Sequence, residues 1–434
     1  MSKAGQSWGR YPHTTQQILA VADRHRSLQT NNAPCLPYGN GRSYGDSCLN
    51  DGGVLLHTRT LDRFIAFDPA TGIVRCEAGV LFAEILDISV PQGWFLPVTP
   101  GTRYVTVGGA IANDVHGKNH HRAGTIGHYV EELELLRTDG QRLRCSDKQN
   151  ADWFAATVGG LGLTGLITWA TLQLRRIKGP WLIVENHRLH NLADFFSLSA
   201  ESDRDYEYTV AWVDCAAKGT KLGRGLLSRA NHAPACPDKQ PHKPSRRLRV
   251  PIAPPMSLVN PLSLRVFNSF YYHRQRKNIV HTVSHYEPFF YPLDAIGDWN
   301  RLYGPRGFLQ YQCVVPLDTA NETILELLRI ISCHGEGSFL AVLKQFGARP
   351  SIGLLSFARP GVTLALDFPH RGKSTFNLLD QLDRVVTAAQ GAVYPAKDAH
   401  MSGQSFRQYF PRWDVFRTFI DPGFSSSFWR RVME

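Results

Sequence analysis

Short runs in which apolar and polar residues alternate fill much of the first 180 residues, and this period of two predicts β-strands. Two of these stretches, 64–77 and 129–144, each contain an internal turn signal, at Asp68-Pro69 and Asp139-Gly140. Each is therefore expected to fold as a β-hairpin. Between the two hairpins, apolar residues recur at helical spacing and predict a helix over 81–91.

A glycine-rich segment at 156–165 separates a predicted helix from a predicted strand. Asn150 is expected to cap the helix, and the β-branched and aromatic run 166–174 predicts the strand. The glycines of this segment match the dinucleotide fingerprint G-x-G-x-x-G, which requires a strand before them and a helix after them. Because the order is reversed here, the pattern argues against a Rossmann nicotinamide site.

Longer helices and strands are predicted after about residue 180. The pattern predicts strands at 308–316 and 362–369, with a helix over 321–332 between them. Gln310 and Gln312 are two apart in the first strand, so their side chains point to the same face. Nothing repeats at a fixed period, which argues against a solenoid or a propeller.

The length and composition are those of a globular protein with two or three domains. The chain has 434 residues, of which 43% are hydrophobic and 20% are charged. Its eight cysteines include no C-x-x-C pair, which argues against a zinc site, an iron–sulfur cluster or a redox dithiol. His116, His120 and His121 lie near Asp114, but no fourth ligand has suitable spacing, so we expect no metal.

Positive charge is concentrated in one segment. The net charge is +11, and the segment 239–286 has no Asp or Glu, whereas nine Lys and Arg residues surround its apolar, Pro-rich part at 250–264. Two interpretations stay open: docking on an anionic membrane surface, or a mobile, solvated basic loop. No nucleic-acid-binding motif accompanies the charge, so no nucleic-acid partner is expected.

The chain contains no apolar run typical of a signal peptide or a membrane span. We therefore expect a cytoplasmic protein, either free or peripheral on the inner face of the plasma membrane.

Candidate chemistry lies in three glycine-rich segments. The first, PYGNGRSYGD (37–46), is a loop whose backbone N–H groups can converge on a pyrophosphate. The second, PVTPGTRYVTVGGAIANDVHGKNHH (97–121), has small residues that let a planar cofactor lie against the backbone. The third is ATVGGLGLTG (156–165).

These segments, with GFLQYQCVVP (307–316), LDFP (366–369) and YPAKD (394–398), resemble the FAD-linked oxidases of the vanillyl-alcohol oxidase type. The resemblance spans nearly the whole chain and implies an α+β fold. A two-part FAD-binding domain is implied, formed by 1–179 and 391–434. An antiparallel-sheet substrate domain, 180–390, is inserted between the two parts, and its sheet covers the flavin ring.

The resemblance also implies the residues that hold FAD. They are Gly39, Gly41, Arg42, Ser43, Tyr44, Gly45, Gly101, Thr106, Val107, Gly108, Gly109, Asn113, His116, Ile167 and Tyr394. Many sugar oxidases of the wider superfamily carry, at the position of Arg42, a histidine that is covalently joined to the flavin. The arginine excludes that bond, so FAD is expected to be non-covalent.

Oxidation of an alcohol needs a hydride acceptor, which is the flavin, and a group that takes the hydroxyl proton. The resemblance implies Lys397, His116 and Tyr44 as catalytic residues, and the sequence does not choose which of them takes the proton. It implies a substrate site formed by Lys118, Gln310, Gln312, Lys344 and Lys397.

Within this family, the chain is most similar to the members that oxidise C2′ of a polyprenyl-phosphoryl-β-D-ribose. The product is a 2′-keto sugar, and a separate NAD(P)H-dependent short-chain reductase completes the epimerisation to the arabinose form. A lipid-phosphate-linked sugar is therefore the expected substrate. Two alternatives stay open: an FAD-dependent oxidase or dehydrogenase of free sugars, alditols or aldonolactones, and a non-catalytic, membrane-associated flavin-binding scaffold. The presence of His116, Lys118 and Lys397 argues against the scaffold.

Overall fold

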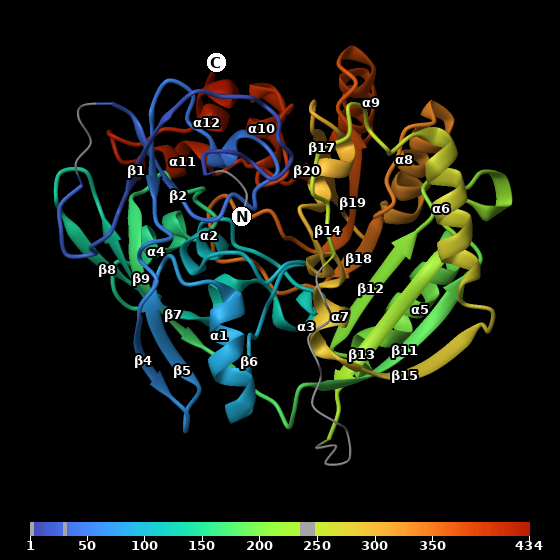
Figure 1. The fold of residues 1–434 in the computed structure, drawn as a ribbon, viewed down its shortest axis with the longest axis horizontal. Coiled ribbons are helices and arrows are strands. Elements are labelled where there is room, and N and C mark those ends of the chain that lie inside the picture. The colour runs from blue at the N-terminus through green and yellow to red at the C-terminus, as the bar shows by residue number, and fades with distance from the viewer. Residues whose placement is uncertain (1–3, 29–32, 235–247) are drawn as a thin grey trace.

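The computed structural model describes residues 4–28, 33–234 and 248–434. Part of the basic segment, including Lys239, Lys243, Arg246 and Arg247, lies outside the described residues. Figure 1 shows two halves side by side: small sheets near both chain termini on the left, and one large sheet with its helices on the right. Both halves combine antiparallel sheets with helices, which confirms the predicted α+β class.

The left half is built on a five-stranded antiparallel sheet and a three-stranded parallel sheet. The larger sheet has the order β4-β5-β9-β7-β8 and contains both predicted hairpins. Its strands are β4 (Phe64–Asp68), β5 (Ile73–Glu77), β7 (Val130–Leu136), β8 (Arg142–Cys145) and β9 (Leu166–Gln173). The smaller sheet has the order β1-β3-β2, with β1 (Gln17–Ala20), β2 (Cys35–Tyr38) and β3 (Val54–His57).

Short helices accompany these sheets: α1 (Phe82–Ser89), α2 (Val107–Ala112), α3 (His120–Ala123) and α4 (Ala151–Thr157). The glycine-rich segment 156–165 runs from α4 into β9, so the helix precedes the glycines and the strand follows them, as predicted. Asn150 occupies the N-cap position of α4 as predicted, but its side chain makes no capping hydrogen bond. Asn150 adopts a left-handed conformation with φ of 51°, and its side-chain amide donates to the carbonyl of Arg144 instead of accepting from α4.

The right half is an eight-stranded sheet in the order β15-β11-β13-β12-β18-β19-β17-β20, with every neighbouring pair antiparallel. The strands are β11 (Trp181–Leu189), β12 (Tyr208–Val213), β13 (Gly225–His232), β15 (Ile279–His285), β17 (Phe308–Val315), β18 (Val342–Phe346), β19 (Gly361–Pro369) and β20 (Ala392–Val393). Four two-residue strands form two separate small ladders. β6 (Trp94–Phe95) pairs with β10 (Arg175–Arg176), and β14 (Leu248–Arg249) pairs with β16 (Ile296–Gly297).

Helices α5 (Leu192–Asp205), α8 (Ala320–His334) and α9 (Lys373–Ala388) pack on one face of this large sheet. Strand residues Leu343, Leu364 and Leu366 share a fully buried core with the helix residues Leu327 and Leu382. Because side chains alternate between the two faces of a strand, the residues between these leucines point to the other face, toward the left half. That face carries the polar residues of the site described below.

The C-terminal segment crosses from the large sheet to the left half. After β20 pairs with β17, helices α10 (Gly403–Tyr409), α11 (Trp413–Arg417) and α12 (Ser427–Met433) lie beside β1 and β2 (Figure 1). Arg431 of α12 donates to both carboxylate oxygens of Asp46, at 2.8 Å each, and to Asp398 at 2.9 Å. These contacts join the two ends of the chain, and we propose that the FAD-binding domain comprises 1–179 and 391–434, with 180–390 as the inserted substrate domain.

Two further helices, α6 (Pro261–His273) and α7 (Tyr286–Phe290), follow the segment that is not described. No helix of the described chain is both long and apolar enough to cross a bilayer.

Candidate active site

The loop that follows β2 has the geometry of an anion-binding nest. Gly41 has φ of +58°, a conformation that turns successive backbone N–H groups toward one concavity. The N–H groups of Asn40, Gly41, Arg42 and Ser43 donate to no acceptor among the described residues. Four consecutive free donors fit a pyrophosphate, as the sequence predicted for this loop.

Arg42 adds an unpaired cation to the same loop. Its guanidinium carbon lies 4.1 Å from the ring centre of Trp8, and its buried Nε has no hydrogen-bond partner within the described residues. Burial lowers the pKa of the guanidinium. Unpaired buried donors cost free energy, so an anionic group of FAD would remove that cost.

Close packing, rather than free donors, characterises the second glycine segment. The N–H groups of Val107 and Gly108 already donate to Val80 and Ala78, and the N–H of Gly109 donates to the side chain of Thr106. A Cβ built on Gly39 would lie 2.4 Å from Oγ1 of Thr106, so the nest and the start of α2 approach each other directly. These residues bring the backbone close to the cofactor site and donate no hydrogen bonds to it.

Some of the other predicted cofactor residues lie near His116, and others do not. Tyr394 donates to the carbonyl of Asn113 at 2.7 Å, and its ring lies 5.8 Å from that of His116. Ile167 is instead part of the apolar core around α2, and Gly101 is exposed, with open space where a side chain would be. The structure thus brings the nest, α2, Asn113, His116 and Tyr394 together, and places Gly101 and Ile167 in no polar contact with them.

His116 is the centre of a cluster of polar side chains, called the chamber below, whose other members are Tyr44, Lys118, Gln310, Gln312, Lys344, Asp367 and Lys397. It is buried, and its Nε2 lies 2.9 Å from Nε2 of Gln312, while its Nδ1 lies 3.2 Å from Nζ of Lys344. The rings of Phe346 and Phe357 flank it. Burial and then the charge of Lys344 lower the pKa of His116 well below its ordinary value, so the imidazole is neutral.

A neutral His116 can satisfy both contacts in either ring tautomer. If the Gln312 amide donates to Nε2, then Nδ1–H must donate to a neutral Lys344 amine. If the Gln312 side chain is turned round, its oxygen accepts from Nε2–H and Lys344 donates to Nδ1, either as an ammonium or as a neutral amine. Burial lowers the pKa of Lys344 to about 7, with the charges of Lys118 and Lys397 contributing, so both arrangements are accessible near neutral pH.

Three lysines that are distant in the sequence meet here. Lys118 donates to the carbonyl of Phe289 at 2.7 Å, and burial lowers its pKa to about 8. Lys397 lies with Nζ 3.7 Å from the ring centre of Tyr44, and burial lowers its pKa to about 7. No described residue accepts a hydrogen bond from the Nζ of Lys397. The chamber therefore concentrates positive charge and leaves one cation available to a ligand.

Tyr44 packs against Phe308, with the ring centres 5.6 Å apart in an edge-to-face arrangement. Burial raises the pKa of the Tyr44 phenol well above its ordinary value. The phenol therefore stays protonated at neutral pH and cannot act as a phenolate base.

Sequence reasoning missed Asp367, the buried carboxyl group of the chamber. It lies on β19 and accepts a hydrogen bond of 2.6 Å from Gln310, the neighbour of Gln312 on the same face of β17. Burial raises the pKa of Asp367 to about 7, although Gln310 and the charge of Lys397 oppose the shift. A lone carboxylate in the apolar strand VTLALDFP was the signal that could have indicated it.

The pKa of Asp367 predicts how stability depends on pH. The folded protein holds this proton up to about pH 7, whereas the unfolded chain releases it near pH ~4, so folding loses stability as the pH rises between these values. Asp367→Asn removes this loss but keeps an oxygen that accepts from Gln310. We expect the melting temperature of the variant to rise relative to the parent protein between pH 5 and pH 8. A constant difference across this range would contradict a raised pKa for Asp367.

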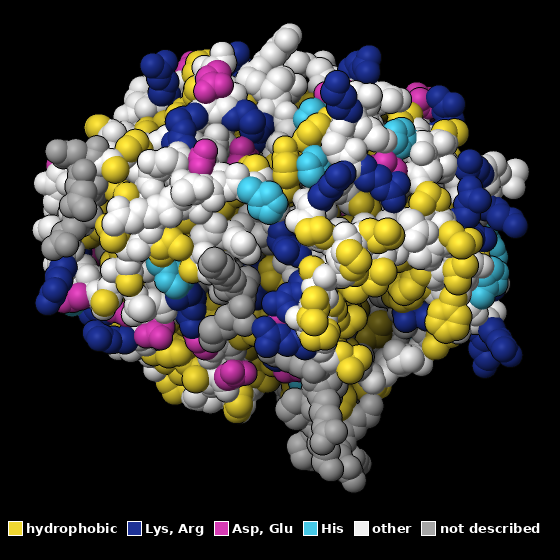
Figure 2. Space-filling view, turned by 45° about the horizontal axis from the view of Figure 1, so that its top comes forward, with side chains coloured by type: hydrophobic (Ala, Val, Ile, Leu, Met, Phe, Trp, Pro, Cys, Tyr) yellow, Lys and Arg dark blue, Asp and Glu magenta, His cyan; other side chains and the backbone are white. Residues whose placement is uncertain are grey.

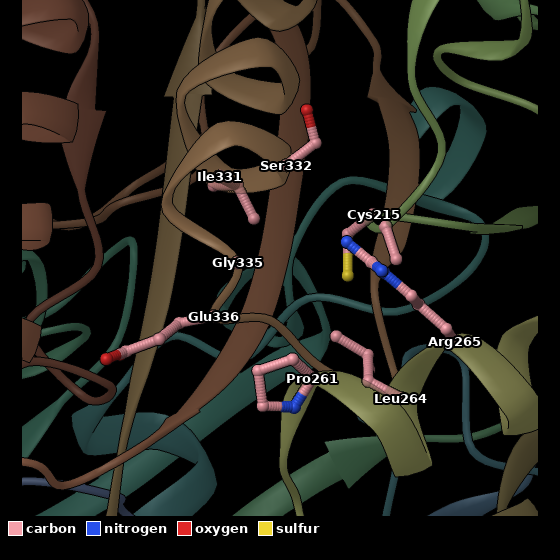
Figure 3. Close-up of a pocket in the computed structure, with 9 residues that line it drawn as sticks. Cys215, Pro261, Leu264, Arg265, Ile331, Ser332, Gly335 and Glu336 are labelled. Carbon is pink, nitrogen blue, oxygen red and sulfur yellow. The ribbon is translucent and has the colours of Figure 1, made fainter.

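Two hollows are lined by residues outside the chamber. The one between α6 and the end of α8 has a cavity volume of about 10 Å³ and is lined by residues that include Cys215, Leu264 and Ile331 (Figure 3). This volume is that of one water molecule, which excludes a sugar substrate. The other is a larger, open hollow of about 350 Å³ whose lining includes Arg122 and Tyr129 but neither His116 nor Lys397. In the described residues, no group of three His, Cys, Asp or Glu side chains could hold a metal ion.

Comparison with known proteins agrees with a flavin site. Residues 10–146 match the FAD-binding domain family. The chain is 35% identical over 446 residues to decaprenylphosphoryl-β-D-ribose oxidase of Mycolicibacterium smegmatis, an alignment that covers 98% of this chain and 96% of the relative. It is 33% identical over 365 residues to an uncharacterized protein of Streptomyces coelicolor, covering 80% and 98% of the two chains. L-gulonolactone oxidase of Mus musculus is 34% identical over 160 residues, or 36% of this chain.

The nest, the cationic chamber and these matches define an FAD-dependent oxidoreductase that acts on CH–OH groups. More narrowly, the chain belongs to the family of FAD-linked oxidases that includes decaprenylphosphoryl-β-D-ribose oxidase. The family predicted from the sequence motifs is thereby confirmed, as is the FAD cofactor.

Proposed function

We propose that the protein oxidises the C2′ hydroxyl of a polyprenyl-phosphoryl-β-D-ribose to the 2′-keto sugar. The observation that carries this proposal is that Lys118, Lys344 and Lys397 come close together, with Nζ of Lys344 at 3.2 Å from Nδ1 of His116 and the other two lysines near enough to lower the pKa of Lys344. A free sugar or alditol is neutral and needs no such concentration of positive charge. A phosphate diester has one negative charge that the lysines can bind. The full-length similarity to an oxidase whose name specifies this substrate supports the same assignment.

We assign substrate binding and catalysis to different residues of the chamber. In this proposal Gln310 and Gln312 bind the sugar hydroxyls, and Lys118 and Lys344 bind the phosphate; the contacts of both glutamines with chamber residues support this assignment. Bound FAD, held non-covalently by the nest and the residues around it, supplies the hydride acceptor. The protein must position the carbinol carbon and take the hydroxyl proton.

We propose Lys397 as the group that takes this proton. Tyr44 remains a neutral phenol, and both ring nitrogens of His116 already contact Gln312 and Lys344. Lys397 has a pKa of about 7 and donates to no described acceptor, so a neutral amine is accessible near pH 7. Once protonated, it stabilises the negative charge that develops nearby.

The product requires a second enzyme if the overall result is an epimerisation. A 2′-keto sugar has lost its stereocentre, and an NAD(P)H-dependent short-chain reductase that delivers hydride to the opposite face would form the arabinose isomer. The lipid tail of such a substrate stays in a bilayer, so the protein must meet it at a membrane surface.

Anaerobic titration of the purified holoprotein tests the proposed substrate. We expect farnesyl-phosphoryl ribose to bleach the flavin absorbance, whereas free alditols and aldonolactones leave it unchanged. Equal bleaching by free alditols would contradict the lipid-phosphate substrate and favour the free-sugar oxidase. Absence of bleaching by every alcohol would favour the flavin-binding scaffold. The similarity to L-gulonolactone oxidase does not favour the hypothesis of a free-sugar oxidase, because the alignment covers little more than a third of the chain.

A further inference from the structure

We propose that residues 248–270 form a docking surface that binds the protein to an anionic lipid bilayer. The docking surface consists of α6 and the segment before it. Its members are Leu248, Ile252, Met256, Leu258, Leu262, Val266 and Phe270. The proposal deepens the proposed function, since it names the place where the protein meets a lipid-linked substrate, and its final step rests on that function.

Exposure of large apolar side chains is concentrated on this surface. Its seven members are each 51–78% exposed, and every other exposed Leu, Ile, Val, Met or Phe of the described chain is less than half exposed. Figure 2 shows hydrophobic side chains gathered on the side of the molecule that carries α6, with Lys and Arg around them. Soluble proteins rarely expose such a contiguous patch unless it binds an apolar partner.

The helix α6 carries large hydrophobic residues on two opposite sides, and only one of these sides packs against the rest of the fold. Leu264, Asn268 and Tyr272 recur every four residues and are buried. Leu262, Val266 and Phe270 have the same spacing on the other side and point to solvent. The outer apolar stripe therefore has no partner within the described fold.

Charge around the docking surface selects an anionic occupant. Residues 248–285 contain five Lys and Arg residues and no Asp or Glu. Arg249 is paired with Asp298 at 2.5 Å, whereas Arg265, Arg274, Arg276 and Lys277 are exposed and pair with no carboxylate in the described part of the chain. Apolar side chains bordered by unpaired cations are the pattern of a helix that lies in the interface of an anionic membrane.

The register of the large sheet places α6 on the same face as the active site. Residues directly opposite each other in antiparallel strands share a face, and Trp212, Val342, Ala365 and Gln312 are successive partners across four strands. Gln312 contacts His116, and Trp212 packs against Tyr271 of α6 with the rings 4.6 Å apart. Three strand spacings separate Trp212 from Gln312, or roughly 14 Å. A bilayer on the docking surface would thus lie beside the substrate chamber.

Vesicle sedimentation of the holoprotein tests the docking surface without any substrate. We expect binding to phosphatidylglycerol vesicles and at least about 10-fold weaker binding to phosphatidylcholine vesicles, because each unpaired cation near an anionic surface contributes about fivefold. The variant Leu262→Ser/Val266→Ser/Phe270→Ser should lose at least about 10-fold in binding to the anionic vesicles. The control Leu317→Ser/Leu325→Ser/Val415→Ser removes three exposed apolar side chains elsewhere and should bind like the parent protein.

Three results would overturn the docking surface: no binding to anionic vesicles, equal loss in the control variant, or a parent dimer in solution that the α6 variant converts to a monomer. The last result would identify a second copy of the chain as the occupant. Thermal melting of both variants checks that they are folded.

The link to the substrate is tested separately with activity. We expect the α6 variant to oxidise detergent-dispersed farnesyl-phosphoryl ribose at the parent rate and to oxidise a long-chain substrate in vesicles about 10-fold more slowly. Equal rates of the α6 variant and the parent protein in vesicles would contradict a role of the docking surface in oxidation of the lipid-linked substrate. If no ribose substrate is oxidised even by the parent protein, the proposed function fails, while the vesicle-binding result still decides the docking surface.

Discussion

Lys397→Ala is expected to leave FAD bound and to slow its reduction by substrate about 10²- to 10⁴-fold, the range that general acid–base groups contribute. Lys397 follows β20 and lies over the Tyr44 ring, with no described acceptor for its Nζ and a pKa of about 7. Its loss removes both the proposed proton acceptor and a cation. The rate of anaerobic flavin bleaching measures the effect, and the visible spectrum measures FAD content.

Two companion variants distinguish the possible roles of Lys397. Lys397→Arg keeps a permanent charge but cannot take a proton at neutral pH, so it should stay slow if proton transfer matters. Recovery of the parent rate by arginine would show that charge alone suffices. Lys148→Ala removes an exposed lysine and serves as the matched control. An unchanged reduction rate in Lys397→Ala would remove this residue from the mechanism.

Gly45→Ala is expected to release FAD and to destabilise the fold. A Cβ on Gly45 would lie 1.7 Å from the carbonyl oxygen of Asp398. This oxygen belongs to the backbone, so it cannot move aside as the end of a flexible side chain could. The neighbouring N–H of Tyr44 donates to Ala396 at 2.9 Å, so a shift here separates the nest from the segment that carries Lys397. We expect this overpacking to lower the free energy of unfolding by about 3 kcal/mol or more, which is the upper end of the range for such substitutions.

The flavin-to-protein absorbance ratio after gel filtration and the melting temperature measure this effect. Gly179→Ala is the matched control, because a Cβ at Gly179 meets no atom within 4 Å and its φ is not in the left-handed region. A Gly45→Ala protein that keeps stoichiometric FAD would contradict the close contact between the nest and the C-terminal segment.

Local chemistry made part of this structure predictable from the sequence. The hairpins around Asp68-Pro69 and Asp139-Gly140 follow from turn residues between alternating runs, and both formed. Alternation along β17 placed Gln310 and Gln312 on one face, and both side chains indeed bond to residues of the chamber. The N-cap position of Asn150 was predicted correctly, but its side-chain bond to the helix was not, because asparagine also tolerates the left-handed conformation and its amide donates to Arg144 instead.

Contacts between residues that are far apart in the chain could not be predicted from local sequence patterns. Lys118, Lys344 and Lys397 come from three distant parts of the chain, and only the fold brings their charges together. Motif resemblance indicated each lysine singly but gave no reason for their lowered pKa values. The outer stripe of α6 was hidden for another reason, since a helix that is apolar on two sides has no clear hydrophobic face in its sequence.

The tie between Arg431, Asp46 and Asp398 also constrains the order of events during synthesis. The nest is translated within the first 50 residues, but the carbonyl that fixes Tyr44 and the arginine that fixes Asp46 come from residues 396 and 431. A nascent chain that has not yet been extended to these residues therefore lacks the contacts that hold the flavin loop. We expect stable FAD binding to follow the synthesis of residues 396–431, although the loop itself is made much earlier.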